Sequence, residues 1–471
     1  MFLSTRNYHY IYNFIVKSSK KNCENIVKKK LELLIFKIKK LPSLKYLIFF
    51  SFIIFSGKIF KKNRAQIKYD NIEIGRFVLS QTFCDFECYL NKFKFYKRLI
   101  KKFLHVGSIL NTCNYYNSKF KISGVYVDHC GYLNGIIFSF FALKKKIVYT
   151  NNNPLGIYNV NYEKNNRKHL LKFENSLRIT IKKKLNNYQK KKAEKKISNL
   201  TKKATFIPYL VKVNYKKLDN INYKLFDYVV YCHSFTDGQL WHGYAGFENT
   251  LEWLEFTLDN LIEKKKQILI KPHPNFYNNS YGANAKWDKK IYETVVNKYK
   301  RYDNLLFLNT PVHNYLLLKQ LNKNCILLSL FGTTILESAY MNFKSICTSH
   351  NFFDKKFQIS NMWQNKINYS KLLNLNVSKL KRPNKIDLLK LSHAMFFYYT
   401  SFYHKNYYTN IIRNNLKLKE GKSQKQFLFK SGGKGRKPIP KSILNRLRES
   451  TRLVEDKIID EISKTISEVK R

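Results

Sequence analysis

Between residues 227 and 348, short apolar runs alternate with polar loops and with segments of helical periodicity. The apolar runs cover 227–232, 267–270, 305–308, 325–329 and 345–348, and the helical patterns cover Leu251–Ile262, 313–322 and 334–341. Runs of four to six apolar residues have the length of buried strands. Strands and helices that alternate this regularly form a parallel sheet covered by helices on both faces. We therefore predict an α/β fold whose second half is a doubly wound sheet.

A shorter alternation of the same kind lies earlier in the chain. Lys121–Val127 and Lys146–Thr150 are candidate strands, and the apolar stretch Leu133–Leu143 between them is a candidate helix. This order is one βαβ unit. The predicted organisation is a basic N-terminal segment (1–66), a Rossmann-like domain (67–210), a second Rossmann-like domain (211–395), closing helices (396–420), a flexible linker rich in Gly and Pro (421–440) and an amphipathic C-terminal helix (441–471).

The strand predicted at 267–270 runs into the stiff loop Lys271-Pro-His-Pro-Asn275. The two prolines restrict the backbone and remove two N–H donors, so the loop can hold His273 in a fixed position. Lys271 adds a positive charge. At the carboxyl end of a parallel strand these groups can face a phosphate or a leaving group. The alternative is a turn with an exposed histidine.

Two further loops follow predicted strands in the same half of the chain. Gly332, Thr333 and Thr334 open a predicted helix, where free N–H groups and hydroxyls favour an anion, although the threonines can also act as plain N-caps. Glu337, one turn later, can accept from a ribose hydroxyl or complete a capping box. His233 and Ser234 follow the first strand and would face the same crevice. The carboxylates and aromatic residues that follow them in the sequence could bind a sugar. The alternative is that they form a packed loop.

In the first half, Asp128 and His129 stand at the end of the strand Lys121–Val127. A carboxylate or imidazole there can take a proton from an acceptor hydroxyl, and one can orient the other. The alternative is a helix N-cap by Asp128. The chain has no Asp-x-Asp triplet, no Walker A motif and no GxGxxG motif. We therefore expect no metal and no bound cofactor. The two loops at the strand ends, 271–275 and 332–334, suggest a nucleotide-linked donor as substrate.

Lys and Arg together number 87 against 31 Asp and Glu, a formal net charge of +56. Lys, Asn, Ile, Phe and Tyr, whose codons are rich in A and T, are all common, so biased composition accounts for part of this excess. The rest of the basic excess is consistent with binding to an anionic membrane or polymer. No nucleic-acid motif is present, and we expect no specific nucleic-acid partner.

Val27–Leu41 has the pattern of a basic amphipathic helix, either an interfacial anchor or a core helix with a lysine-coated face. Tyr46–Phe55 is intensely apolar but shorter than the about 20 residues that a membrane span needs. We therefore expect a cytoplasmic protein, peripheral to the inner face of the plasma membrane.

The Lys-Pro-His-Pro element, followed by Gly332-Thr-Thr-Ile-Leu-Glu337, resembles bacterial capsule and surface polysaccharide biosynthesis proteins with the GT-B glycosyltransferase fold. The segment from His233 to Glu248 is similar to one branch of that group. The resemblance implies two Rossmann-like domains facing a cleft, with the acceptor on the first and the donor on the second. It also implies that His273 and Thr333 or Thr334 contact donor phosphate. Many relatives carry a histidine before the Gly-Thr pair, where this chain has Leu330 and Phe331.

By this resemblance the partners would be a nucleotide sugar and a glycan or lipid-linked glycan acceptor. Two alternatives remain open at this point. One is a polyol-phosphate transferase of the CDP-glycerol type. The other is a non-catalytic partner in polysaccharide assembly or export.

Overall fold

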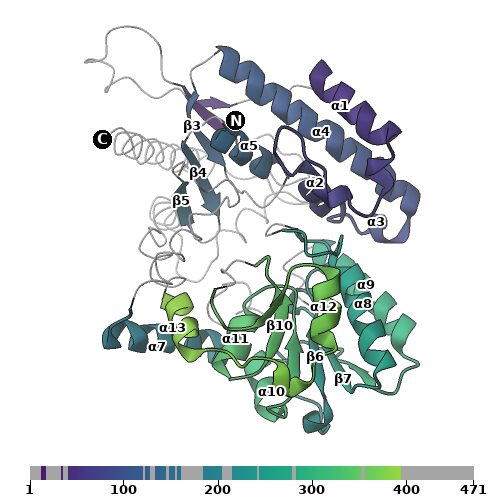
Figure 1. The fold of residues 1–471 in the computed structure, drawn as a ribbon, viewed down its shortest axis with the longest axis vertical. Coiled ribbons are helices and arrows are strands. Elements are labelled where there is room, and N and C mark those ends of the chain that lie inside the picture. Colours follow the sequence, from purple (N-terminus) through teal and green to yellow (C-terminus); the bar gives the residue numbers. More distant parts are fainter. Residues whose placement is uncertain are drawn as a thin grey trace, which may run out of the picture.

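The computed structural model contains two β-sheets, each with its own helices (Figure 1). The residues that it describes are 12–16, 33–35, 41–119, 122–127, 133–144, 148–153, 156–160, 184–203, 215–240, 243–277, 283–351 and 356–393. We refer to the part of the chain around the first sheet as the first unit and to the part around the second sheet as the second unit.

The second unit is built on six strands in the order β11-β10-β9-β6-β7-β8. They are β6 (Tyr228–Tyr231), β7 (Ile268–Lys271), β8 (Leu305–Phe307), β9 (Ile326–Leu328), β10 (Ser345–Thr348) and β11 (Asn361–Trp363), and every neighbouring pair is parallel. Read from β8 to β11, the chain order is 3-2-1-4-5-6, the order of a doubly wound nucleotide-binding sheet. The predicted α/β class and the doubly wound second half are confirmed.

Both faces of this sheet are buried, and successive strand residues enter different cores. Tyr228 and Val230 pack into one core with residues of α8 (Thr250–Glu263), α9 (Ala283–Tyr299) and α11 (Thr334–Tyr340). Val229 and Tyr231 pack into the opposite core with residues of α10 (Asn314–Gln320). A strand covered on both faces carries apolar residues continuously, which is why these runs do not alternate in the sequence.

Two further helices, α12 (Lys366–Leu373) and α13 (Lys385–His393), follow β11. The helix α7 (Asn187–Lys203) also packs in the second unit, because Ile197 and Leu200 lie in the same core as α8 and α9. The expected division had placed 187–203 with the first domain. The packing joins it to the second unit instead.

The first unit has a mixed sheet in the order β2-β1-β3-β4-β5. Its strands are β1 (Tyr12–Val16), β2 (Leu33–Ile35), β3 (Ile122–Val127), β4 (Val148–Asn153) and β5 (Gly156–Val160). The pair β3 and β4 is parallel and is joined through α5 (Leu133–Lys144), as the predicted βαβ unit requires. The other pairs are antiparallel.

Four further helices of this unit pack together, and α2 and α4 contact α5: α1 (Leu44–Phe55), α2 (Ile74–Thr82), α3 (Glu87–Leu90) and the long α4 (Lys92–Lys119). Tyr46 of α1 and Phe103 of α4 lie in one core with Ile137 of α5. The end of the predicted N-terminal segment is therefore part of the first unit. The expectation of a helix over Val27–Leu41 is wrong at Leu33–Ile35, which form a strand paired with β1.

No helix among the described residues is long and apolar enough to cross a membrane. The predicted linker, the C-terminal helix and the segment 396–420 lie outside the described residues.

The two units are joined through residues 64 to 89 on one side and, on the other, the loop after β6 together with α9. The ring of Phe86 stacks on Trp287 of α9 at 4.6 Å between centroids. The hydroxyl of Tyr89 donates to the carbonyl of Phe235 at 2.5 Å. Arg64 makes a largely buried ion pair with Glu248 at 2.8 Å. These contacts place the carboxyl end of the second sheet against the first unit.

Candidate functional site

The candidate site lies where the strand order of the second sheet reverses, between β6 and β9. In open α/β sheets this point leaves a crevice outside the carboxyl ends of the strands, and ligands bind there. His233 follows β6 by two residues, Phe331 and Gly332 follow β9, and His273 follows β7. The topology therefore brings together three of the loops that the sequence singled out.

His233 links the two central strands. Its Nε2 lies at hydrogen-bond distance from the carbonyl of Phe331, and because a carbonyl can only accept, Nε2 carries the proton. The ring also lies 4.1 Å from the Phe331 ring, centroid to centroid. Burial lowers the pKa of His233 to about 4, although the hydrogen bond to Phe331 opposes this shift. At neutral pH, His233 is an uncharged donor that orients the loop after β9.

Gly332 sits directly against this histidine. Its φ of +114° lies in a region that residues with a side chain rarely adopt. A Cβ at this position would lie 3.4 Å from Cε1 of His233. Glycine is required here by the backbone conformation more than by lack of space.

His273 and Lys271 form the second wall of the site. The His273 ring stacks against His233 with centroids 6.1 Å apart. Burial, together with the charges of His233 and Lys271, lowers the pKa of His273 to about 3. The stiff loop predicted from the two prolines thus holds an uncharged imidazole beside His233.

Lys271 is the last residue of β7, and its side chain is only 4% exposed. Burial lowers its pKa to about 8, while the carboxyl of Glu337 acts in the opposite direction. Among the residues that the structure describes, its ammonium has no hydrogen bond and no ion pair within 4.0 Å, and its contact is with the Tyr231 ring, 5.9 Å from the centroid. A buried ammonium is costly unless it is paired. The Glu337 carboxyl compensates this charge only in part, without a direct ion pair, and an anion bound in the crevice would supply a direct partner.

Glu337 lies behind Lys271 in a buried network. Asn314 of α10 donates through Nδ2 to Oε2 of Glu337 at 2.7 Å and accepts from the Tyr231 hydroxyl at 2.8 Å. Burial raises the pKa of Glu337, and the Asn314 hydrogen bond and the Lys271 charge oppose the shift. Glu337 is buried, so it is not a solvated carboxylate on the helix surface.

The two threonines begin α11. Thr333 occupies the N-cap position, but its side chain makes no capping hydrogen bond. Thr334 donates to the hydroxyl of Ser329 at 3.4 Å. The capping alternative is therefore not realised by either hydroxyl, and both lie at the start of the helix that follows Gly332.

Ser234 forms its hydrogen bond with Asp288 of α9. Its hydroxyl donates to Oδ2 of Asp288 at 2.5 Å, and the backbone and hydroxyl of Thr236 donate to Oδ1 of the same carboxyl at 2.7 and 2.8 Å. Burial raises the pKa of Asp288 to about 6. Ser234 thus anchors the loop after β6 to α9, which holds His233 in place. Asp288 was not identified from the sequence, although it falls on the apolar stripe of α9 with Ala285, Ile291 and Val295.

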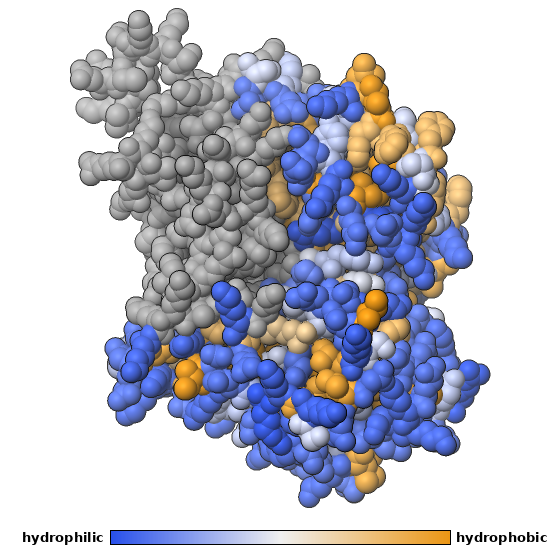
Figure 2. Space-filling view, viewed as in Figure 1, coloured by the Kyte–Doolittle hydropathy of each residue, from blue (hydrophilic) through white to orange (hydrophobic). Residues whose placement is uncertain are grey.

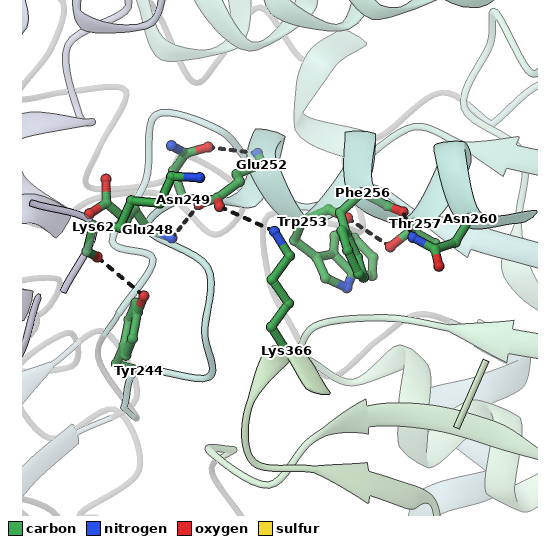
Figure 3. Close-up of polar contacts among 10 residues, drawn as sticks. All are labelled: Lys62, Tyr244, Glu248, Asn249, Glu252, Trp253, Phe256, Thr257, Asn260 and Lys366. Atoms are coloured by element: carbon green, nitrogen blue, oxygen red, sulfur yellow. Dashed lines mark hydrogen bonds and ion pairs between the residues drawn. The ribbon is translucent and has the colours of Figure 1, made fainter. Parts of the chain in front are cut away.

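The loop that leads from Asp237 into α8 is packed rather than open. Phe235 and Phe247 are buried in the core. Figure 3 shows how its end is fixed: Tyr244 donates to the Lys62 carbonyl of the first unit at 3.4 Å, and Asn249 caps α8 by accepting from the Glu252 amide at 2.8 Å. Glu252 in turn accepts from the Glu248 amide at 2.8 Å. These contacts favour the packed-loop interpretation over a sugar site for the described part of this segment.

A small cavity lies beside the Phe331 loop and has a volume of about 20 Å³, room for about one water molecule. Residues of the loops after β6, β9 and β10 line it, among them Gln239, Leu330 and Thr348. Asp128 and His129, the predicted base, follow the end of β3 immediately and lie outside the described residues.

No protein-family model and no curated protein matches this sequence. Among solved structures, the chain is similar to the β-Kdo 2,4-transferase KpsC of Thermosulfurimonas dismutans, with 10% identity over 54% of this chain and 73% of that chain and a TM-score of 0.31. It is also similar to the UDP-GlcNAc 2-epimerase of Methanocaldococcus jannaschii, with 14% identity over 63% of this chain and 81% of that chain and a TM-score of 0.27. These TM-scores are too low to assign a fold, so the α/β class rests on the sheet order itself.

Proposed function

We propose that the chain is a glycosyltransferase that moves a sugar from a nucleotide donor to a glycan acceptor, with the donor bound at the strand ends of the second unit. The observation that carries the proposal is the buried ammonium of Lys271 at the end of β7, next to the reversal of strand order, together with the uncharged imidazoles of His233 and His273. A diphosphate offers anionic oxygens to both kinds of group.

The roles follow from the geometry of each residue. Lys271 would neutralise a phosphate, His273 would donate to it, and the hydroxyls of Thr333 and Thr334 would add hydrogen bonds. His233 would act by positioning Gly332, because its Nε2 proton is already shared with Phe331. Glu337 would accept from a ribose hydroxyl through its remaining lone pairs. Together these groups would stabilise the negative charge that develops on the departing nucleotide.

The acceptor would lie on the first unit, which packs against the strand ends of the second. Asp128 or His129 would take the proton of the attacking hydroxyl. That hydroxyl oxygen would form the new bond to the anomeric carbon as the bond from that carbon to the donor phosphate breaks. The acceptor would be a glycan or a lipid-linked glycan of a surface polysaccharide.

The first test is nucleotide binding, measured by thermal shift with CMP, CDP, UDP, GDP and ADP. We expect one base to raise the melting temperature, and Lys271→Met and His273→Ala to lose that shift. Lys344→Met is a matched control, because Lys344 is also buried but donates to the Val377 carbonyl, away from the site. A ligand present at 100 times its Kd stabilises the folded state by about 2.7 kcal/mol, which such a measurement resolves.

The second test separates the possible donors. If CDP is the ligand, CDP-glycerol and CDP- or CMP-linked sugars are compared in a transfer assay that follows nucleotide release. Transfer from CDP-glycerol alone would identify a polyol-phosphate transferase. If the folded protein binds no nucleotide at all, the proposal is wrong and the assembly or export partner becomes the better account.

A further inference from the structure

The outer face of α1 carries a stripe of large apolar side chains. Leu44, Ile48, Phe52 and Phe55 are 74%, 64%, 57% and 89% exposed. Their spacing of four, four and three residues places them on one side of the helix. Figure 2 shows apolar residues gathered at the upper right of the molecule, where Figure 1 places α1. Exposed apolar residues elsewhere, such as Leu225, Ile367 and Ile386, lie on separate elements.

The opposite face of α1 is firmly packed, so this exposure is built into the fold. Tyr46, Phe50 and Ile53 are buried, and the Tyr46 hydroxyl donates to the Phe103 carbonyl of α4 at 2.8 Å. Tyr46 packs where α4 has Gly107, since a Cβ there would lie 2.3 Å from the tyrosine ring. Ser43 caps the start of the helix, and Gly57, with φ +67°, ends it. The helix is held in register and cannot rotate to bury the stripe.

Lysines lie near both ends of the stripe. Lys45, Lys58 and Lys61 are exposed, and Nζ of Lys58 lies 4.8 Å from the centroid of the Phe52 ring. From Leu33 to Tyr69 the sequence contains no Asp and no Glu. Apolar side chains flanked by lysines are the pattern of a helix that lies in the interface of an anionic bilayer.

We propose that the Leu44–Phe55 face of α1 docks the protein on anionic lipid, with the stripe in the interfacial layer and the lysines at the headgroups. The charge selects this occupant. A second copy placed symmetrically on the same face would bring two sets of lysines together, and like charges repel. The inference is independent of the proposed activity, because it uses no residue of the nucleotide site.

The test is cosedimentation of the full chain with phosphatidylcholine vesicles with and without phosphatidylglycerol. The variant Ile48→Gln/Phe52→Gln removes two apolar side chains without changing the net charge. The matched control Ile367→Gln/Ile386→Gln removes two exposed apolar side chains of the second unit. We expect the wild type and the control to bind the anionic vesicles equally. The α1 variant should bind at least about tenfold more weakly, because the transfer free energy of both side chains is lost.

Two comparisons make the result decisive. Salt should weaken binding, because the Debye length falls from about 10 Å at 0.1 M to about 3 Å at 1 M. The melting temperature of the α1 variant should not fall, because the stripe is exposed. Equal vesicle binding by variant and wild type would overturn the proposal and leave adhesion by net charge alone. The proposal is also wrong if the wild type does not bind vesicles and the α1 variant has a lower melting temperature. In that case a protein segment or a second copy covers this face.

Discussion

The imidazole of His233, just after β6, donates from Nε2 to the carbonyl of Phe331, just after β9. This hydrogen bond joins the two strands between which the sheet order reverses. The next residue, Gly332, has φ +114° and lies beside the histidine ring. The loop that we propose for donor phosphate is therefore shaped by a neutral histidine rather than by a charged one.

Gly332→Ala tests the backbone requirement. The substitution should destabilise the fold by roughly 1–3 kcal/mol, because alanine is strained at this φ, and it should abolish nucleotide binding by moving the amide of Thr333. Chemical denaturation and thermal shift with the nucleotide measure the two effects.

Gly57→Ala is the matched control. Gly57 also has a positive φ, of +67°, but nothing lies within 4 Å of its added Cβ and it ends α1, far along the chain from the site. It should lose a similar stability and keep nucleotide binding. If Gly332→Ala binds nucleotide as well as this control does, the loop after β9 is not part of the donor site.

Lys271→Met should stabilise the ligand-free protein while removing nucleotide binding. Burial lowers the pKa of Lys271 from 10.5 to about 8, so holding the charged form in the fold costs on the order of 3 kcal/mol. The gain at pH 7 should be smaller, roughly 1–3 kcal/mol, because Glu337 loses its neighbouring cation.

The pH dependence of this difference has a defined sign. Between pH 8 and 10.5 the unfolded chain holds a proton on Lys271 that the folded chain has released, so the stability of the wild type rises with pH across this window. The advantage of Lys271→Met over the wild type should therefore shrink as the pH rises from 8 to 10. Urea denaturation at three pH values measures it. An advantage that stays constant with pH would mean that the Lys271 charge is already compensated.

Most of the second unit was predictable because its strands are buried on both faces. Such strands appear in the sequence as short unbroken apolar runs, and β10, Ser345–Thr348, was located to the residue. The residues at the strand ends, Lys271, His273 and Gly332, were predictable for the same reason. Once the strands are known to be parallel, their exit loops must share one edge of the sheet.

Other elements were missed because their stability comes from tertiary packing. The helix α9 is dense in lysine, and its burial depends on Tyr292 and Tyr299, which pack among residues distant in sequence. The strand β2, with three residues, is specified by its pairing with β1 and not by its own pattern. The role of Asn314 as the link between Tyr231 and Glu337 could not be predicted, because the three residues lie on different elements.

Arg64→Met should weaken the contact between the two units. Arg64 pairs with Glu248 across the units at 2.8 Å, and both side chains are largely buried. Burial raises the pKa of Glu248, and Arg64 opposes the shift. Removing the cation while keeping an apolar stem over Phe95 should cost about 3–5 kcal/mol, because a buried carboxylate is left unpaired.

Arg64→Met/Glu248→Gln should recover much of this loss, because the unpaired charge is removed as well. Equilibrium unfolding of the two variants and the wild type gives the comparison. If the double variant is as unstable as the single one, the loss comes from packing and not from the buried carboxylate.

Nucleotide binding should be accompanied by proton uptake. In the ligand-free site the pKa of His273 is about 3 and that of Lys271 is about 8. A phosphate beside them favours their charged forms and raises both pKa values. At pH 8 Lys271 is about half protonated, so binding should draw up to about half a proton from solution, and affinity should increase as the pH falls from 9 to 7. Calorimetry in two buffers of different ionisation enthalpy measures the uptake. In the wild type the uptake should fall between pH 8 and pH 7, because Lys271 is then largely protonated before the nucleotide binds. Binding heats that do not depend on the buffer would show that the phosphate does not contact these groups.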